Sequence, residues 1–251
     1  MTTFQYITIF LYGIIIGSFL NVCIYRIPRK ENIVTTPSHC MNCGYQLKWY
    51  DLLPLLSFIQ IKGRCRSCKT KLSLQYPLVE LCNGVLYIII FLANGFHIES
   101  VLYCLATSTL LVISFIDFKT FEIPPMCNLI IGVLGIIELG LHIGDWKLYI
   151  IGFFAVSTFL LLIFWITKGR GIGGGDIKLM AAAGLLLGWK LVIVAFLWGC
   201  ILGSIIHILR MKISREENVL AFGPYLSMGV FLAMIYGEQF IDWYLRLCMI
   251  R

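Results

Sequence analysis

The sequence predicts an all-α polytopic membrane protein with about eight transmembrane helices and one small polar loop rich in cysteine. Hydrophobic residues make up 59% of the 251 residues, charged residues make up only 13%, and the mean hydropathy is +0.89. Soluble domains contain roughly 45–50% apolar residues. Because the apolar residues are gathered in runs long enough to cross hydrocarbon as helices, a membrane protein is favoured over a soluble one.

Eight apolar runs are the predicted membrane helices. The first run has no small-residue cleavage site after it, so we interpret it as a retained helix and not as a signal peptide. The sixth run is short for a span, and Gly188-Trp189-Lys190 could be a tight turn between two tilted helices. The runs are Phe4–Tyr25, Leu74–Ala93, Val101–Asp117, Ile123–Ile143, Lys147–Thr167, Lys178–Gly188, Leu191–Leu209 and Ala221–Ile241.

The basic residues predict the orientation of these helices. A net charge of +7 is compatible with nucleic-acid binding, but the Lys and Arg residues lie mostly in loops between apolar runs. With the amino terminus outside, the loops on the cytoplasmic side hold 16 of the 20 basic residues, and the opposite side holds 4. This asymmetry is typical of membrane proteins. We therefore expect the lipid bilayer as a partner, no nucleic acid, and a cytoplasmic location for the long polar loop.

The polar loop contains two C-x-x-C pairs about twenty residues apart. This spacing is typical of a zinc ion held by four thiolates, although a redox pair or free thiols are alternatives. A disulfide framework is disfavoured because the loop lies on the reducing side of the membrane. Four thiolates leave no position for a catalytic water, so we predict a structural zinc site, with His39 outside it. The predicted ligands are Cys40, Cys43, Cys65 and Cys68.

Two aspartates lie at the cytoplasmic ends of predicted helices. Asp117 follows an apolar run directly, and Asp176 follows the glycine-rich stretch 171–175. Carboxylates at the edge of hydrocarbon are expensive and mark functional sites, and glycines allow another chain to come close. If the two helices pack side by side, the carboxyl groups could share one proton and act on water as acid and base. The alternative is two unrelated interfacial aspartates that are solvated by the cytoplasm.

Six motifs in this order resemble those of the type IV prepilin leader peptidases, membrane aspartyl proteases of the GxGD group. The resemblance covers nearly the whole chain. A lone GxGD motif is weak evidence, whereas six motifs in the right order are strong. They are Gly17-Ser18-Phe19-Leu20-Asn21-Val22 with Arg26-Ile27-Pro28, the paired C-x-x-C loop, Tyr76-Pro77-Leu78-Val79-Glu80-Leu81 with Gly84, Ile116-Asp117 with Ile123-Pro124, Gly173-Gly174-Gly175-Asp176-Ile177-Lys178-Leu179, and Phe222-Gly223-Pro224-Tyr225.

The resemblance implies a reaction and a location. It implies that Asp117 and Asp176 are the catalytic pair and that the substrate is the basic leader of a type IV prepilin or pseudopilin, cut after a glycine on the cytoplasmic side of the bacterial inner membrane. Many members of the family then methylate the new amino terminus with S-adenosylmethionine. The chain has no glycine-rich strand–turn–helix signature for that donor, so its binding residues stay unknown. Pro125 occupies a place where the family usually carries an acidic or amide residue, which leaves the local helix geometry in question.

We therefore expect a first transmembrane helix (1–25), a cytoplasmic loop with the tetracysteine zinc site (26–73) and a transmembrane aspartyl protease domain (74–251). The alternatives are a peptidase without methyltransferase activity, a non-catalytic membrane assembly protein that docks a partner through its zinc loop, and a transporter. Transport is disfavoured because both aspartates lie at one face, whereas carriers bind near the midplane.

More than one interpretation stays open for four polar residues, Glu80, Asn21, Arg26 and Glu138. His97, His142 and His207 lack metal-ligand spacing and are interpreted as interfacial or satisfied histidines.

Overall fold

The computed structural model describes residues 3–214 and 220–248, and its regular structure there is helical apart from two isolated β-bridges. The chain divides into two compact units, Met1–Leu92 and Ala93–Arg251. The basic residues Arg215 and Arg251, which count toward the predicted charge asymmetry, lie outside the described residues.

The first unit consists of α1 (Thr3–Arg26), a long loop with the short helix α2 (Leu56–Gln60), and α3 (Gln75–Asn94). Small residues let α1 and α3 come into backbone contact. A Cβ atom on Gly13 would lie 2.7 Å from the Cα atom of Gly84. At the same place the buried Asn83 side chain donates a hydrogen bond of 2.7 Å to the Gly13 carbonyl. Small residues and interhelical hydrogen bonds of this kind hold helices together in membranes, where no hydrophobic difference drives association.

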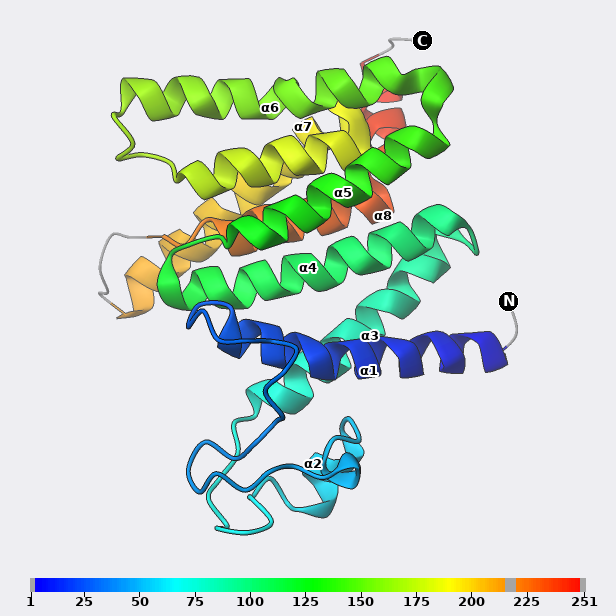
Figure 1. Cartoon of the computed structure of the whole chain (residues 1–251). Helices are drawn as coiled ribbons and strands as arrows, with labels where there is room; N and C mark the ends of the chain where they lie inside the picture. Colours follow the sequence, from blue (N-terminus) through cyan, green and yellow to red (C-terminus); the bar gives the residue numbers. More distant parts are fainter. Residues whose placement is uncertain (1–2, 215–219, 249–251) are drawn as a thin grey trace. The chain divides into compact units, whose positions relative to one another are not determined.

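The described part of the second unit contains five α-helices (Figure 1), and a short 3-10 helix (Ile143–Asp145) connects the second to the third. The α-helices are α4 (Ile98–Thr120), α5 (Pro125–Leu141), α6 (Trp146–Ile166), α7 (Gly174–Ser214) and α8 (Gly223–Leu247). Helix α7 packs against α5, α6 and α8, and α4 packs against α5 and α8. Helix α5 begins at Pro125, with proline at the first helical position. Proline suits that position because its missing N–H would have no partner in the helix and its φ is already helical.

Helix α7 is interrupted at Gly188. This residue has φ 76° and ψ 171°, which is a non-helical conformation inside the 41-residue element. Only glycine adopts such a positive φ without strain. The interruption lies in the segment Gly188-Trp189-Lys190 that the sequence marks as a tight turn, so α7 contains two of the predicted apolar runs.

The prediction of an all-helical, multi-pass membrane protein is confirmed. In the described part of the chain, five helical segments are long and apolar enough to cross a membrane: Thr3–Arg26, Gln75–Asn94, Ile98–Thr120, Ile143–Ile166 and Gly174–Lys212. Helix α5 is apolar but has only 17 residues, and α8 is not among the five. Eight separate spans therefore remain a prediction, although every one of the eight apolar runs falls largely on a described helix.

Glycines also bring α6 and α7 into contact. A Cβ atom on Gly152 would lie 2.7 Å from the backbone carbon of Gly188 and 2.8 Å from the amide nitrogen of Trp189, and it would also clash with the Gly184 carbonyl. Backbone atoms cannot give way as a flexible side chain can. This contact therefore requires the absence of a side chain at position 152.

We predict that Gly152→Ala destabilises the protein, because the added methyl group must push α6 away from α7. Overpacking in a close-packed core costs about 1–3 kcal/mol. Thermal unfolding of the purified protein in detergent measures the loss. The matched control is Gly140→Ala in α5, where a Cβ atom would meet nothing within 4 Å, so its midpoint should stay the same or rise. Equal midpoints for Gly152→Ala and the wild type would contradict the packing argument.

Candidate active site

Asp117 lies in the last turn of α4, and its carboxylate faces the amino-terminal end of α8. The residue is 4% exposed. Its Oδ2 accepts a hydrogen bond of 2.9 Å from the amide of Gly223, the first residue of α8. The site leaves no room for a side chain at 223, because a Cβ atom there would lie 2.8 Å from the same oxygen. Free amides and the helix dipole make a helix amino terminus a favourable place for a carboxylate.

Asp176 lies in the first turn of α7 and is 9% exposed. Its Oδ2 accepts a hydrogen bond of 3.3 Å from the amide of Gly173, just before the helix begins. Glycine at 173 allows this contact, because a Cβ atom there would lie 3.1 Å from the same oxygen. Both predicted aspartates are therefore buried, and the carboxyl group of each lies beside the amino terminus of a helix: that of α8 for Asp117 and that of α7 for Asp176.

The structure brings the two aspartates close enough for their charges to interact. Ile123, in the connection between α4 and α5, packs between Gly175, which precedes Asp176, and Gly223, which binds Asp117. A Cβ atom on Gly175 would lie 3.0 Å from the Ile123 Cβ, and one on Gly223 would lie 3.2 Å from its Cδ1. In addition, the Asn128 side chain of α5 donates a hydrogen bond of 3.2 Å to the Gly175 carbonyl. The ends of α4, α5, α7 and α8 thus meet around one pair of carboxyl groups.

Sequence reasoning found the two aspartates but gave no role to Asn128 or to the Gly223 amide. Gly223 belongs to a recognised motif, Phe222-Gly223-Pro224-Tyr225, but nothing in that motif indicates that its backbone binds Asp117. Asn128 carries an amide three residues after Pro125. Its side chain contacts Gly175, the residue before Asp176.

The four cysteines of the first unit form one cluster. Their Sγ atoms all lie within 4.8 Å of one another, and the Cys40–Cys68 and Cys43–Cys65 pairs are both 3.9 Å apart. A tetrahedral zinc ion with Zn–S bonds of ~2.3 Å has sulfur–sulfur edges of about 3.8 Å. The cluster therefore fits a tetrathiolate metal ion, and His39 is not part of it.

Two turns of the same shape present these sulfurs. In the first turn, the Gly44 amide donates to the Cys40 carbonyl, and the Cys40 amide donates to the Tyr45 carbonyl. In the second turn, Lys69 and Thr70 make the same two hydrogen bonds with Cys65. Gly44 and Lys69 occupy the matching position and both have positive φ, 71° and 60°. The second turn therefore places a lysine in a conformation that glycine adopts more easily.

Hydrogen bonds in these turns favour the thiolate form of Cys40 and Cys68, whereas the pKa of Cys43 is raised to about 11 by burial and by its contacts with the other three sulfurs. The Thr70 hydroxyl, the Thr70 amide and the Asn42 side chain lower the pKa of Cys68 to about 5. The backbone amides of Asn42 and Cys43 lower the pKa of Cys40. Since thiolates are the form that binds a metal ion, the turns are organised for metal binding.

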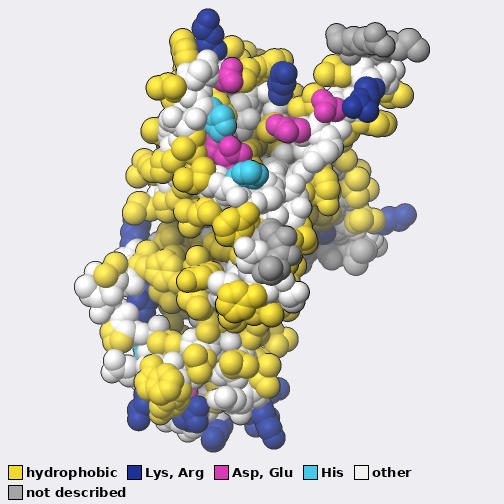
Figure 2. Space-filling model, turned by 90° about the vertical axis from the view of Figure 1, so that its right-hand side faces the viewer, with side chains coloured by type: hydrophobic (Ala, Val, Ile, Leu, Met, Phe, Trp, Pro, Cys, Tyr) yellow, Lys and Arg dark blue, Asp and Glu magenta, His cyan; other side chains and the backbone are white. Residues whose placement is uncertain are grey.

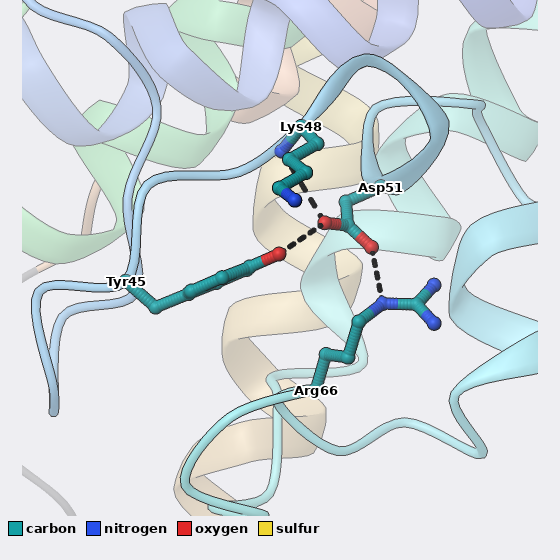
Figure 3. Close-up of polar contacts among 4 residues, drawn as sticks. All are labelled: Tyr45, Lys48, Asp51 and Arg66. Carbon is teal, nitrogen blue, oxygen red and sulfur yellow. Dashed lines mark hydrogen bonds and ion pairs between the residues drawn. The ribbon is translucent and has the colours of Figure 1, made fainter.

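Asp51 links the segment after the first turn to the second turn itself (Figure 3). Its carboxylate accepts hydrogen bonds from the Tyr45 hydroxyl (3.3 Å), the Lys48 amide (3.3 Å) and Arg66 Nε (2.9 Å). The side chain of Asp51 is only 3% exposed. Burial raises the pKa of this carboxyl, but the hydrogen bond from Arg66 and those from the Lys48 amide and Tyr45 outweigh it, so the pKa lies below its usual value.

Comparison with known proteins identifies the family. Residues 11–94 match the bacterial peptidase A24 N-terminal domain, and residues 104–208 match the type IV leader peptidase family. A prepilin leader peptidase/N-methyltransferase of Bacillus subtilis (strain 168) is 31% identical over 244 residues, which cover 96% of this chain and 98% of the relative. The chain belongs to the type IV leader peptidase family.

Other members of the family with the same name are similar over nearly the same length. The proteins of Aeromonas salmonicida (strain A449) and Pseudomonas aeruginosa are each 29% identical, over 272 and 271 residues, and in both cases 94% of this chain and 92% of the relative are covered. No solved structure matches the chain significantly. The family predicted from the motifs is confirmed, and with it a leader peptidase in preference to an assembly protein or a transporter.

The first unit of this family member also contains a cavity of about 300 Å³. Its lining includes Asn21 near the end of α1, Tyr76 and Glu80 near the start of α3, and residues of the cysteine turns. Asn21 is 4% exposed; its Nδ2 donates to the Tyr76 carbonyl at 3.1 Å, and its Oδ1 has no hydrogen-bond partner. Glu80 is 7% exposed, and one carboxylate oxygen accepts the Leu55 amide at 2.8 Å. The cavity thus offers buried acceptor oxygens.

Arg26 also lines this cavity, but its guanidinium is hydrogen-bonded to carbonyl groups of the loop. The residue is 4% exposed, and its guanidinium donates to the carbonyls of Asn32 (3.1 Å), Thr36 (2.8 Å) and Pro37 (3.3 Å). Arg26 therefore holds the start of the loop in place and does not bring an available positive charge into the cavity.

We predict that the purified protein contains about one zinc ion per chain, as a tetrathiolate site requires. Cys40→Ser and Cys65→Ser should each remove the ion and make the loop 26–73 sensitive to protease, because metal binding supplies much of the folding energy of so short a loop. Elemental analysis and limited proteolysis measure the two effects. Cys82→Ser, in α3 and outside the cluster, should keep both properties. A metal-free loop that resists protease would contradict the prediction.

Proposed function

We propose that the protein cleaves the basic leader from type IV prepilins or pseudopilins, after a glycine and at the cytoplasmic face of the bacterial inner membrane, with Asp117 and Asp176 as the catalytic pair. The observation that carries this proposal is the meeting of two buried carboxyl groups from distant parts of the sequence, each at a helix amino terminus. Membership of the leader peptidase family supports the reaction class.

The paired carboxyl groups suit general acid–base hydrolysis. Two like charges at short range cannot both ionise easily, so one carboxyl keeps a proton while the other stays ionised. The ionised group takes a proton from water, whose oxygen adds to the scissile carbonyl carbon. The protonated group then gives its proton to the leaving amine as the carbon–nitrogen bond breaks. The pair ends with one proton again, now on the other carboxyl group.

The backbone around Asp176 suits an extended substrate. A Cβ atom on Gly174 would meet nothing within 4 Å, so the start of α7 offers an open backbone beside the carboxylate. A substrate strand can approach such a surface closely because no side chains stand between the two backbones. The substrate leader is basic, and acidic residues or lipid headgroups would bind it.

The proposed topology places the amino terminus outside and eight helices across the membrane, with residues 26–73 in the cytoplasm. The charge asymmetry and the match of the eight apolar runs with described helices support it. Within this topology, residues 1–25 form the first membrane helix, 26–73 the loop with a structural zinc ion, and 74–251 the protease domain. The geometry of the four sulfurs supports zinc as the bound metal.

We further propose that the cavity of the first unit holds the methyl donor. The names of the relatives include N-methyltransferase, and the two aspartates are assigned to hydrolysis, so methylation needs a second site. When bound, S-adenosylmethionine supplies a methyl group, which the new amino terminus of the pilin takes up while it loses a proton. The unpartnered Asn21 oxygen and the Glu80 carboxylate fit a cationic cofactor, since buried acceptors favour positive charge.

We predict that Asp117→Asn and Asp176→Asn each lower the rate of prepilin cleavage by about 10²–10⁴-fold, the contribution usual for a general acid or base. The assay is leader removal from a prepilin in membranes, followed by gel shift. Both variants should keep their zinc and their helical circular dichroism, because neither residue belongs to the cysteine loop.

The matched control is Asp145→Asn, which replaces an exposed aspartate of the same unit and should cleave at the wild-type rate. Wild-type cleavage by either Asp117→Asn or Asp176→Asn would show that the pair is not catalytic.

We predict that Glu80→Gln weakens binding of S-adenosylmethionine at least about tenfold, because a hydrogen bond to a charged group contributes about 1.5–3 kcal/mol. Calorimetry of the purified protein measures binding directly. Cleavage by Glu80→Gln should continue, and mass spectrometry of the cut pilin should find an unmethylated amino terminus. Glu31→Gln, an exposed control in the same unit, should bind as the wild type does. Wild-type affinity of Glu80→Gln would rule out this cavity, whereas no binding by the wild type would favour a peptidase without methyltransferase activity.

A further inference from the structure

Three side chains of the second unit converge at the start of α4 and the end of α5, away from the aspartate pair. His142 Nε2 lies 3.3 Å from Glu99 Oε1, and His142 Nδ1 lies 3.4 Å from Glu138 Oε1. One ligand atom from each residue lies within 4.8 Å of the other two. The sequence did not reveal this group, because Glu99 is distant in the chain and a single Glu–His pair is too common to indicate a metal.

One carboxylate oxygen of Glu138 is buried and has no hydrogen-bond partner. The residue is 2% exposed, and its Oε2 is buried without a hydrogen-bond partner. The contact with His142 reaches only its other oxygen. A buried carboxylate oxygen without a partner costs free energy comparable to a lost hydrogen bond, and such an atom often marks the place of an ion or a water molecule.

Two acidic side chains flank one imidazole ring in this group. Glu99 and Glu138 each contact a different nitrogen of His142. When both carboxyl groups are ionised, a single imidazolium leaves one negative charge over. Figure 2 shows acidic and histidine side chains gathered together on one face among hydrophobic ones. A divalent cation would balance this charge.

We infer that Glu99, Glu138 and His142 form a binding site for a divalent first-row transition-metal cation. Imidazole favours zinc and its neighbours, and carboxylates favour harder ions such as Mn²⁺, so a mixed set suits Zn²⁺ or Mn²⁺ in preference to Ca²⁺ or Mg²⁺. The 3.3 Å between His142 Nε2 and Glu99 Oε1 matches the edge of about 3.3 Å in a tetrahedron with bonds of ~2.0 Å. Three protein ligands leave one position for water.

The position of this site in the fold indicates what the cation would do. Glu99 lies in the first turn of α4 and Asp117 in its last. At 1.5 Å per residue the two are separated by about 27 Å along the helix. The cation therefore has no direct part in cleavage. It would join the start of α4 to the end of α5, the two helices whose opposite ends flank the aspartate pair.

The test measures zinc and manganese binding by the full-length protein. The wild type, prepared with its cysteine site filled, should take up a second saturable Zn²⁺ in equilibrium dialysis, and Mn²⁺ should compete for it. Glu138→Gln and His142→Gln should each lose this second ion and keep the first. Glu99→Gln replaces a half-exposed ligand, so it disturbs the buried packing least. It should weaken binding of the second ion at least about tenfold, because even loss of an outer-shell partner of a metal ligand costs about 10–100-fold in affinity.

The outcomes separate this site from the cysteine site and from misfolding. Prepilin cleavage by each variant reports a folded protein, because the ligands lie far from the aspartates. Glu122→Gln, outside the cluster, should bind both ions. Wild-type uptake of the second ion by both Glu138→Gln and His142→Gln would overturn the inference, and so would a wild type that binds neither Zn²⁺ nor Mn²⁺ beyond the first ion.

Discussion

The hydrogen bond from the Gly223 amide to Asp117 is the contact on which the second unit depends. It joins the end of α4 to the beginning of α8, and it gives a buried carboxylate a backbone amide as its partner. Asp176 is held in a similar manner by the amide of Gly173. Helix amino termini carry both free amides and the positive end of the helix dipole. The fold thus gives each of two buried carboxyl groups a backbone amide as its partner.

Helix contacts through glycine make this arrangement possible. Gly152 meets α7 at the interruption of that helix, and Gly175 meets Ile123 beside the carboxyl pair. In a membrane, large apolar side chains contact lipid as favourably as they contact another helix. Small residues instead let two helix backbones approach closely, and this packing holds the helices together. The same glycines would destabilise a soluble helix by about 0.5–1 kcal/mol each. Their presence inside apolar runs is therefore a sign of helix contacts.

The helices and the site could be predicted to different depths. Hydrophobic runs and the glycine before Trp189 indicated the helices and the interruption of α7, because those features depend on local composition. The cysteine spacing indicated one four-sulfur site, because a short loop with two turns has few other ways to gather its sulfurs. The aspartates could be found because charge at the edge of an apolar run is unusual. In contrast, the Gly223 amide, Asn128 and the Glu99–Glu138–His142 group depend on which helix ends meet, and nothing local in the sequence encodes this.

The contacts of Arg26 should be insensitive to salt. Its guanidinium is bound by neutral carbonyl oxygens of the loop and not by a carboxylate. Ion pairs between exposed charges weaken as salt rises because counterions screen them. A buried cation that donates to carbonyls at short range has little to lose from screening. The junction between α1 and the cysteine loop should therefore keep its shape as the ionic strength changes.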